Sequence, residues 1–224
     1  MTGRARNHLL LGVTGGIATG KSAVADLLQE KGALTIDFDL LAREIQAPGQ
    51  PAYQEIVSHF GPDVVLENGM LNRRRLSEIV FADPQKKSLL ERFTHGRIRA
   101  AFHEKFNRYI VEQPDATVQA VIPLLIESRM QALFDRILVI YAPAAVQLRR
   151  LVRRDQLSEE HARRILASQL DIEQKRAQAG FVIDNSGELS ATRQQVDDLW
   201  NELQALKEQR ADGSEKKPRE PHDL

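Results

Sequence analysis

A glycine-rich stretch that ends in a lysine and a serine lies between an apolar run and a segment with helical spacing. Residues 15–22 read Gly-Gly-Ile-Ala-Thr-Gly-Lys-Ser, which fits the pattern G-x-x-x-x-G-K-[S/T]. Glycines let the backbone turn where a Cβ atom would clash, so successive N–H groups can point at one anion at the start of a helix. The residues that we expect to hold ATP phosphates are those of this loop: Gly15, Gly16, Ile17, Ala18, Thr19, Gly20, Lys21 and Ser22.

The last two residues of the loop predict the chemistry of the site. A lysine in this position binds the β- and γ-phosphates, and the hydroxyl that follows it ligates Mg²⁺. We therefore expect Lys21 to act in catalysis and Ser22 to be a metal ligand. The chain has no G-x-G-x-x-G followed by an acidic residue in ribose range, and it has no Asn-Lys-x-Asp. These absences argue against a dinucleotide site and a GTP switch, which leaves chiefly phosphoryl transfer to a small acceptor.

A second cluster of charge follows later in the chain. From Gln147 to Arg164 there are six arginines against three acidic residues, although the whole protein is neutral. In small-molecule kinases a lid of arginines closes over the phosphates, excludes water and stabilises the charge on the transferring group. Arg150 and Arg154 are four residues apart, hence on one helix face, and we expect them to be the catalytic lid residues. The alternative is a basic face that only contacts solvent.

A hydroxyl that attacks a phosphate needs a base. Asp37 ends the second apolar run, and open α/β sheets bind ligands at the edge where strands end. We expect Asp37 to be the general base, on a strand next to the strand of the glycine loop. The alternative for Asp37 is a cap for the helix that runs through Arg43. For Asp39 we favour a helix cap over a secondary substrate contact.

Five short apolar runs could be the strands that position these groups. Segments with helical spacing separate the runs, which predicts an α/β fold: a five-stranded parallel sheet of P-loop NTPase type, flanked by helices. The expected strands are 9–13, 33–36, 118–122, 137–141 and 181–183.

We expect one kinase domain over residues 1–209, with a core of about 8–37, 117–143 and 180–209. The interval 38–116 is too long for a simple crossover, so it predicts a helical substrate-binding insertion. Its expected helices are 51–60, 73–81 after the cap Asn72, and a long helix from Asp83-Pro84 toward Tyr109. Residues 144–179 would form the lid, 189–208 a packing helix, and the charged stretch 210–224 a disordered tail.

Composition sets broad limits on function. Lys plus Arg equal Asp plus Glu at 31 each, there is no cysteine, and no apolar run approaches the length of a membrane span. We therefore expect a cytoplasmic enzyme with no nucleic-acid or membrane partner and no disulfide, either a monomer or a weak homo-oligomer.

Taken together, these motifs resemble those of the dephospho-CoA kinase family, over roughly residues 8–205. The resemblance is carried by residues in every part of the chain: Gly12 to Gly16 with Gly20-Lys21-Ser22, Asp37-Phe38-Asp39, Ala42-Arg43, Phe60-Gly61, Gly69, Leu71, Arg73, Val80-Phe81, His95, Ile98-Arg99, Pro123-Leu124-Leu125, Glu127, Gln147, Arg150, Arg154, Asp155, Lys175 and Ile183-Asp184-Asn185.

The resemblance implies phosphorylation of the ribose 3′-hydroxyl of dephospho-CoA by ATP, with Asp37 as base, Arg150 and Arg154 in the lid, and Asn185 near the adenine. It implies acceptor binding by Thr14, Asp37, Asp39, Arg43, His95, Arg99, Pro123, Leu124 and Leu125. A nucleoside monophosphate kinase, another small-metabolite kinase, and a regulator that only binds ATP remain as alternatives.

Four positions depart from the family pattern. Phe38 replaces an alanine and is expected to repack the acceptor pocket, and Gly180 replaces an aspartate before the last strand. Gly96 replaces a proline after His95, so we expect a more mobile loop there. Ala18 stands where glycine is common.

Overall fold

The computed structural model describes residues 7–211, and these residues form two compact units. The first unit holds the described residues up to Ile36 and from Phe106 onward. The second unit is Asp37–Lys105. The chain passes from one unit to the other twice, after Ile36 and after Lys105.

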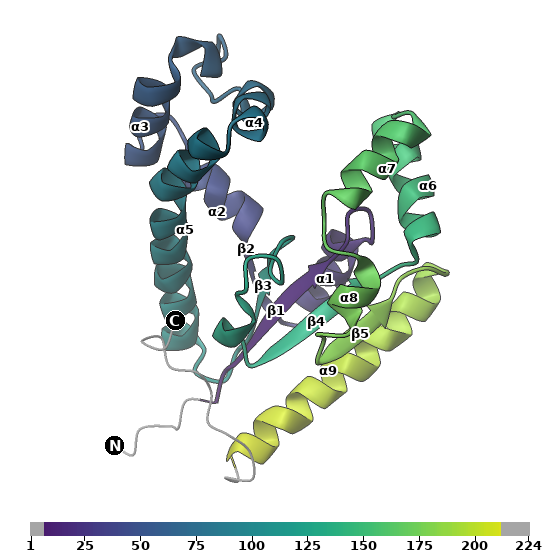
Figure 1. Cartoon of the computed structure of the whole chain (residues 1–224). Helices are drawn as coiled ribbons and strands as arrows, with labels where there is room; N and C mark the ends of the chain where they lie inside the picture. The colour runs from purple at the N-terminus through teal and green to yellow at the C-terminus, as the bar shows by residue number, and fades with distance from the viewer. Residues whose placement is uncertain (1–6, 212–224) are drawn as a thin grey trace. The chain divides into compact units, whose positions relative to one another are not determined.

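The first unit contains a five-stranded sheet, which confirms the predicted fold class. Its strands are β1 (Leu9–Gly15), β2 (Leu34–Asp37), β3 (Thr117–Val121), β4 (Arg136–Tyr141) and β5 (Phe181–Asp184). The strands are parallel and their order is β2-β3-β1-β4-β5 (Figure 1).

Our expectation that the strand of Asp37 lies next to the strand of the glycine loop is wrong, because β3 lies between β1 and β2. Burial gives the physical reason. Every residue of β3 is buried, as a central strand requires, whereas β2 is mostly half-exposed and forms the edge of the sheet.

Five helices lie wholly within the described residues of the first unit: α1 (Lys21–Glu30), α6 (Ala144–Asp155), α7 (Glu159–Ala167), α8 (Ile172–Arg176) and α9 (Leu189–Ala211). A 3₁₀ turn (Gln131–Leu133) precedes β4. Helices α1 and α9 pack beside each other along the sheet (Figure 1). Their apolar faces meet β1 and β4 in one core, to which α9 contributes the predicted stripe of Val196, Leu199 and Leu203.

Helix α9 is longer than predicted and ends at Ala211 rather than near residue 208. The extension is explained by Arg210, which is only 8% exposed and whose guanidinium lies 3.3 Å from the Asp135 carboxylate. Asp135 also accepts a hydrogen bond of 2.7 Å from the backbone N–H of Leu10 in β1. Of the tail expected at 210–224, residues 212–224 lie outside the described residues.

The second unit is helical. It contains α2 (Phe38–Ile45), α3 (Pro51–Phe60), a 3₁₀ turn (Pro62–Val64), α4 (Arg73–Ala82) and most of α5 (Pro84–Glu112). Its core is built on Ile56, Val64, Leu71 and Leu76. The predicted cap of α4 is confirmed, since Asn72 Oδ1 accepts a 3.1 Å bond from the N–H of Arg75.

The expected loop at Gly96 is wrong, because Gly96 lies inside the long helix α5. Phe102, Phe106 and Ile110 follow one another every four residues, and all three are buried, which keeps α5 helical past residue 109 to Glu112. Within residues 7–211, no helix is long and apolar enough to cross a membrane.

The buried pair at the end of α9 can be tested. Arg210→Met leaves Asp135 with an uncompensated charge in the interior, so the free energy of unfolding should fall by about 3 kcal/mol in urea denaturation. The control is Arg193→Met, which breaks an exposed pair with Glu30 and should cost less than about 1 kcal/mol. Equal losses in both variants would contradict the role given to Arg210.

Candidate active site

The glycine loop connects β1 to α1, as predicted, and its backbone lies against neighbouring elements. A Cβ atom on Gly15 would lie 2.4 Å from the carbonyl oxygen of Ile140, and one on Gly16 would lie 2.3 Å from Gln147 Oε1. Gly20 has a φ of 92° and forms the N-cap of α1. Gly15 and Gly20 therefore require glycine, because one would overlap backbone and the other has a positive φ, whereas a larger residue at Gly16 would have to displace the Gln147 amide.

Ala18 carries backbone strain in this loop. Its φ is 58°, in the left-handed region that costs a residue with a Cβ atom on the order of 1 kcal/mol. The family pattern usually has glycine here, whereas this chain has alanine at a positive φ.

Lys21 and Ser22 occupy the first turn of α1, where backbone N–H groups and the helix dipole favour an anion. Lys21 Nζ donates to the carbonyl oxygens of Gly15 at 3.1 Å and Gly16 at 2.9 Å, so the ammonium lies over the loop. Ser22 is exposed on the same turn.

Asn185, which follows β5, braces the loop from another side. Its Nδ2 donates to the carbonyl oxygen of Thr19 at 2.7 Å, and its Oδ1 accepts from the hydroxyl of Thr192 at 2.8 Å. The hydroxyl of Thr19 in turn donates to Gly16 at 2.9 Å. The expected contact of Asn185 with adenine stays a prediction, because the side chain is engaged with the loop.

Helix α6 begins at the loop. Gln147 is buried, donates to the carbonyl oxygen of Ala142 at 2.8 Å and lies against Gly16. Arg150 and Arg154 follow at three and seven residues, so they share the helix face of Gln147. Both predicted lid arginines thus lie on the same face of α6 as Gln147, the residue that contacts the loop.

The arginines of α6 differ in their partners. Arg154 binds Asp155 at 2.7 Å, and this hydrogen bond raises the pKa of Arg154 and lowers the pKa of Asp155. Arg149, Arg150 and Arg153 form no ion pair with any residue of the described part of the chain. Their uncompensated charge makes α6 a favourable place for a polyanion.

In the second unit Asp37 is the N-cap of α2. Its Oδ1 accepts bonds from the N–H groups of Asp39 at 2.7 Å and Leu40 at 3.1 Å. Our preferred interpretation of Asp39 as the helix cap is therefore wrong: β2 continues to Asp37, so the helix begins two residues earlier than that interpretation requires.

Three charged residues come together beside α2. Burial and the nearby charge of Arg43 lower the pKa of Arg73, and Asp39 opposes this shift. Sequence reasoning gave Arg73 no role, although Arg73 was part of the family resemblance. Two guanidinium groups close enough to repel each other would both be stabilised by an anion.

The remaining predicted acceptor residues lie on α5 and after β3. His95 and Arg99 are exposed one turn apart on α5, and the Phe38 ring packs on Phe102 at 5.2 Å. After β3, the carbonyl oxygen of Pro123 accepts a 3.1 Å bond from the hydroxyl of Thr14.

The two leucines after Pro123 differ in exposure. Leu124 is 45% exposed, whereas Leu125 is fully buried, close to the Cα of Gly12. The side chain of Leu125 therefore serves the core, and a substrate contact there would fall to its backbone. At Gly180 a Cβ atom would meet only ordinary contacts, so the structure explains neither the glycine nor the loss of the aspartate.

A glycine-rich phosphate loop between β1 and α1 of a parallel sheet, with an arginine-bearing helix starting on it, defines a P-loop kinase. Shikimate kinase from Acinetobacter baumannii, at 18% identity and a TM-score of 0.50, has the same fold. The family model of dephospho-CoA kinase matches residues 9–191. The chain belongs to the dephospho-CoA kinase family.

Individual relatives agree with this assignment. A dephospho-CoA kinase of Moorella thermoacetica is 43% identical over 195 residues, which cover 87% of this chain and 92% of that protein. The solved structure of dephospho-CoA kinase from Campylobacter jejuni matches at 32% identity with a TM-score of 0.66, covering 88% of this chain and 97% of its own. The resemblance found in the sequence is confirmed.

The strain at Ala18 predicts a stabilising substitution. Ala18→Gly should raise the free energy of unfolding by about 1 kcal/mol, because glycine adopts a positive φ without steric cost. Ala177→Gly is the control, since Ala177 is exposed with a φ of −63° and its replacement should destabilise by about 0.5 kcal/mol. Urea denaturation of the nucleotide-free protein measures both, and a loss of stability in Ala18→Gly would contradict the strain.

The contact between Gly20 and Asn185 predicts a coupling. A Cβ on Gly20 would lie 2.1 Å from Asn185 Nδ2, so Gly20→Ala should lower the free energy of unfolding by more than ~1 kcal/mol. Adding Asn185→Ala removes the clash but leaves the strained φ. In a double-mutant cycle, the double variant should therefore lose less free energy of unfolding than the sum of the losses in the two single variants. Simple additivity would show that the two residues are independent.

Proposed function

We propose that this protein transfers the γ-phosphoryl group of ATP to the ribose 3′-hydroxyl of dephospho-CoA, giving coenzyme A and ADP, which is the last step of coenzyme A biosynthesis. The observation that supports it most is the complete phosphate loop, with Lys21 over it, in a chain that belongs to this family. We further propose that the enzyme works in the cytoplasm as a monomer or weak homo-oligomer, without a nucleic-acid or membrane partner.

On the donor side, the loop N–H groups and Lys21 bind the β- and γ-phosphates. Lys21 leaves the carbonyl oxygens of Gly15 and Gly16 for the stronger, charged acceptors of the nucleotide. Arg150 and Arg154 neutralise charge on the transferring group, for which Arg154 must exchange Asp155 for a phosphate oxygen. Asn185 keeps the loop in shape through Thr19.

Asp37 has the atoms for a general base. Its Oδ1 caps α2, while its Oδ2 has no hydrogen bond to any residue within 7–211. In the proposed step Oδ2 accepts the proton of the 3′-hydroxyl while the hydroxyl oxygen bonds to the γ-phosphorus. The bond from the γ-phosphorus to the β,γ-bridging oxygen breaks, and ADP leaves.

On the acceptor side, the basic groups of the second unit suit an anionic substrate. Dephospho-CoA contains a pyrophosphate, and Arg43, Arg73, His95 and Arg99 are the groups that we propose to bind it, with Asp39, Thr14 and the Pro123 loop as further contacts. Ion pairs of this kind are strongest when Arg binds phosphate oxygens in two places.

The donor set of this chain fits Mg²⁺ held largely by the nucleotide. Among the described residues there is no group of three His, Cys, Asp or Glu side chains that could hold a metal ion. Ser22, exposed on the first turn of α1, is the protein ligand that we propose, with phosphate oxygens and waters completing the shell. Bound there, Mg²⁺ would neutralise phosphate charge.

A coupled assay of ADP release tests the acceptor. We expect turnover with dephospho-CoA and not with AMP, CMP, adenosine or shikimate. Turnover with a mononucleotide would point instead to a nucleoside monophosphate kinase. ATP binding without turnover of any acceptor would point to a nucleotide-gated regulator.

Asp37→Asn separates the two roles of Asp37. Asparagine is as good an N-cap as aspartate, so the melting temperature and the KM for ATP should stay close to those of the unmodified enzyme. Loss of the base should lower kcat by about 10²- to 10⁴-fold in the same assay. Asp63→Asn, at an exposed aspartate of the second unit, is the control for a lost surface charge. An unchanged kcat in Asp37→Asn would remove Asp37 from the mechanism.

A further inference from the structure

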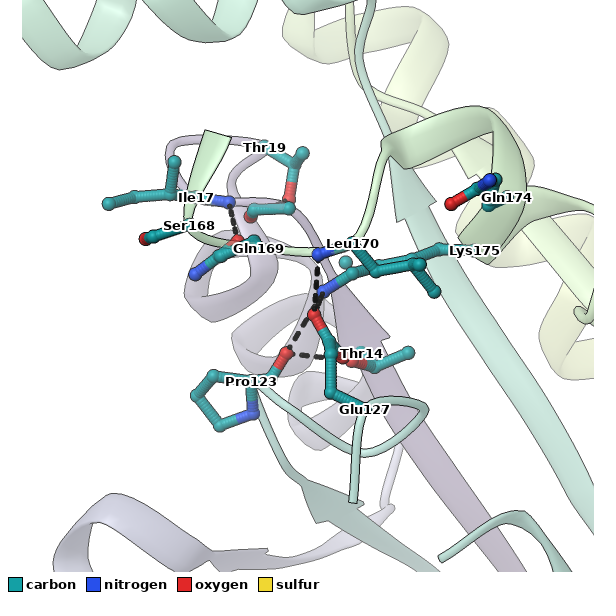
Figure 2. Close-up of polar contacts among 12 residues, drawn as sticks. Thr14, Ile17, Thr19, Pro123, Glu127, Ser168, Gln169, Leu170, Gln174 and Lys175 are labelled. Atoms are coloured by element: carbon teal, nitrogen blue, oxygen red, sulfur yellow. Dashed lines mark hydrogen bonds and ion pairs between the residues drawn. The ribbon is translucent and has the colours of Figure 1, made fainter. Parts of the chain in front are cut away.

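A lysine with no exposed surface lies beside the proposed nucleotide site. Lys175 is in α8, and its Nζ contacts Glu127 Oε1 at 2.7 Å and the carbonyl oxygen of Pro123 at 3.4 Å (Figure 2). Well-packed apolar residues are often as stable as a buried ion pair, because removing both charges from water offsets their attraction. Stability therefore does not explain why the chain has this pair.

The same carboxylate oxygen also holds the backbone of the lid. Residues 168–171, which we name the return connection, lead from α7 back to α8. The N–H of Leu170 in this connection donates to Glu127 Oε1 at 3.2 Å. One oxygen atom thus fixes both α8 and the point where the lid returns to the sheet.

Both ends of this network reach the phosphate loop. At one end, the Pro123 carbonyl oxygen that Lys175 contacts also accepts from the hydroxyl of Thr14, the residue just before Gly15. At the other end, Gln169, next to Leu170, accepts a 3.0 Å bond from the N–H of Ile17 through its Oε1 (Figure 2). The two contacts flank the pair of glycines at which the loop turns.

Helix α8 is also held by contacts with Tyr141 at the end of β4. The hydroxyl of Tyr141, at the end of β4, donates to Glu173 Oε1 at 2.6 Å, and this bond raises the pKa of Tyr141. The guanidinium of Arg176 lies over the Tyr141 ring, 4.9 Å from its centre. Helix α8 is therefore bound to β4 and, through Lys175, to the connection after β3.

We propose that Glu127 and Lys175 are positioning residues for phosphoryl transfer. They hold the return connection in place, so that Gln169 can accept the hydrogen bond from the N–H of Ile17. This bond fixes the position of the phosphate loop relative to the lid. The inference rests on the proposed function for its kinetic consequence. Neither residue touches a reacting atom. Their effect is on alignment, to which phosphoryl transfer is sensitive because positioning provides most of the rate.

The central variant is the double substitution Glu127→Gln/Lys175→Met. It removes the buried charge of Lys175 together with the half-buried charge of Glu127, and the amide that replaces the Glu127 carboxylate retains an oxygen for the N–H of Leu170. Glu127 Oε2 has no hydrogen bond to any described residue, so the amide nitrogen displaces no existing contact. The matched control is Lys31→Met/Asp197→Asn, which makes the same exchange at an exposed lysine–carboxylate pair.

We expect the double variant to keep most of the stability of the unmodified protein, while kcat falls by on the order of 10- to 100-fold. The KM for ATP should change by less than about threefold, since alignment rather than binding is lost. The surface control should keep kcat within about twofold. A stable double variant with full kcat would show that the pair is only structural, and would overturn the proposal.

Hydrogen exchange at the Ile17 amide gives a readout that needs no turnover. In the double variant this amide should exchange faster, because without Lys175 the oxygen at position 127 is less firmly fixed and holds Leu170, and with it Gln169, more loosely. Unchanged exchange would overturn the proposal even if kcat falls. If the unmodified protein proves not to phosphorylate dephospho-CoA, the proposed function fails, yet this exchange still decides whether the pair holds the loop.

Gln169→Ala provides a second variant in case the double variant does not fold. It cuts the last link of the network and removes no buried charge. We expect faster exchange at Ile17 and a lower kcat, with the melting temperature little changed. A kcat within about twofold of the unmodified enzyme would contradict the role of the network.

Discussion

The structure depends on one constraint, which is that the backbone of the phosphate loop lies in contact with elements from three other parts of the chain. At Gly15, Gly16 and Gly20, a Cβ atom would overlap the Ile140 carbonyl group, Gln147 and Asn185, respectively. β4, the start of α6 and the connection after β5 are thus each fixed against the loop. The position of α6, which we propose to be part of the lid, follows from this packing, because Gln147 is both buried and a neighbour of the loop.

The two units of the chain carry different sets of proposed binding residues. The residues proposed to bind the nucleotide, Lys21, Ser22 and Arg150, belong to the first unit, and the basic residues proposed for the acceptor belong to the second. The chain leaves the first unit between Ile36 and Asp37, so the proposed base is the first residue of the second unit. One oxygen of Asp37 caps α2, and the other is left for the proton transfer that we propose.

Much of the fold and the loop follows from the sequence because their signals are local. The apolar runs, the glycine pattern and the cap at Asn72 each depend on neighbouring residues, and the structure has them where predicted. The errors arose where distant contacts decide. The end of α9 depends on Asp135, the helical state of Gly96 depends on apolar residues further along α5, and the true cap of α2 depends on where β2 ends. No local pattern reveals that Lys175 and Glu127 meet.

The two ends of the described chain meet at one place. Asn7 donates to the carbonyl oxygen of Lys207 at 2.6 Å, and Arg210 donates to that of His8 at 3.4 Å. Domains with neighbouring ends commonly tolerate a change of chain order. A circular permutant that joins these ends by a short linker and opens at the exposed turn between Glu67 and Asn68 would leave the residues that contact the loop uncut. Activity of such a permutant would show that the order in which the strands are synthesised is separable from the site that they build.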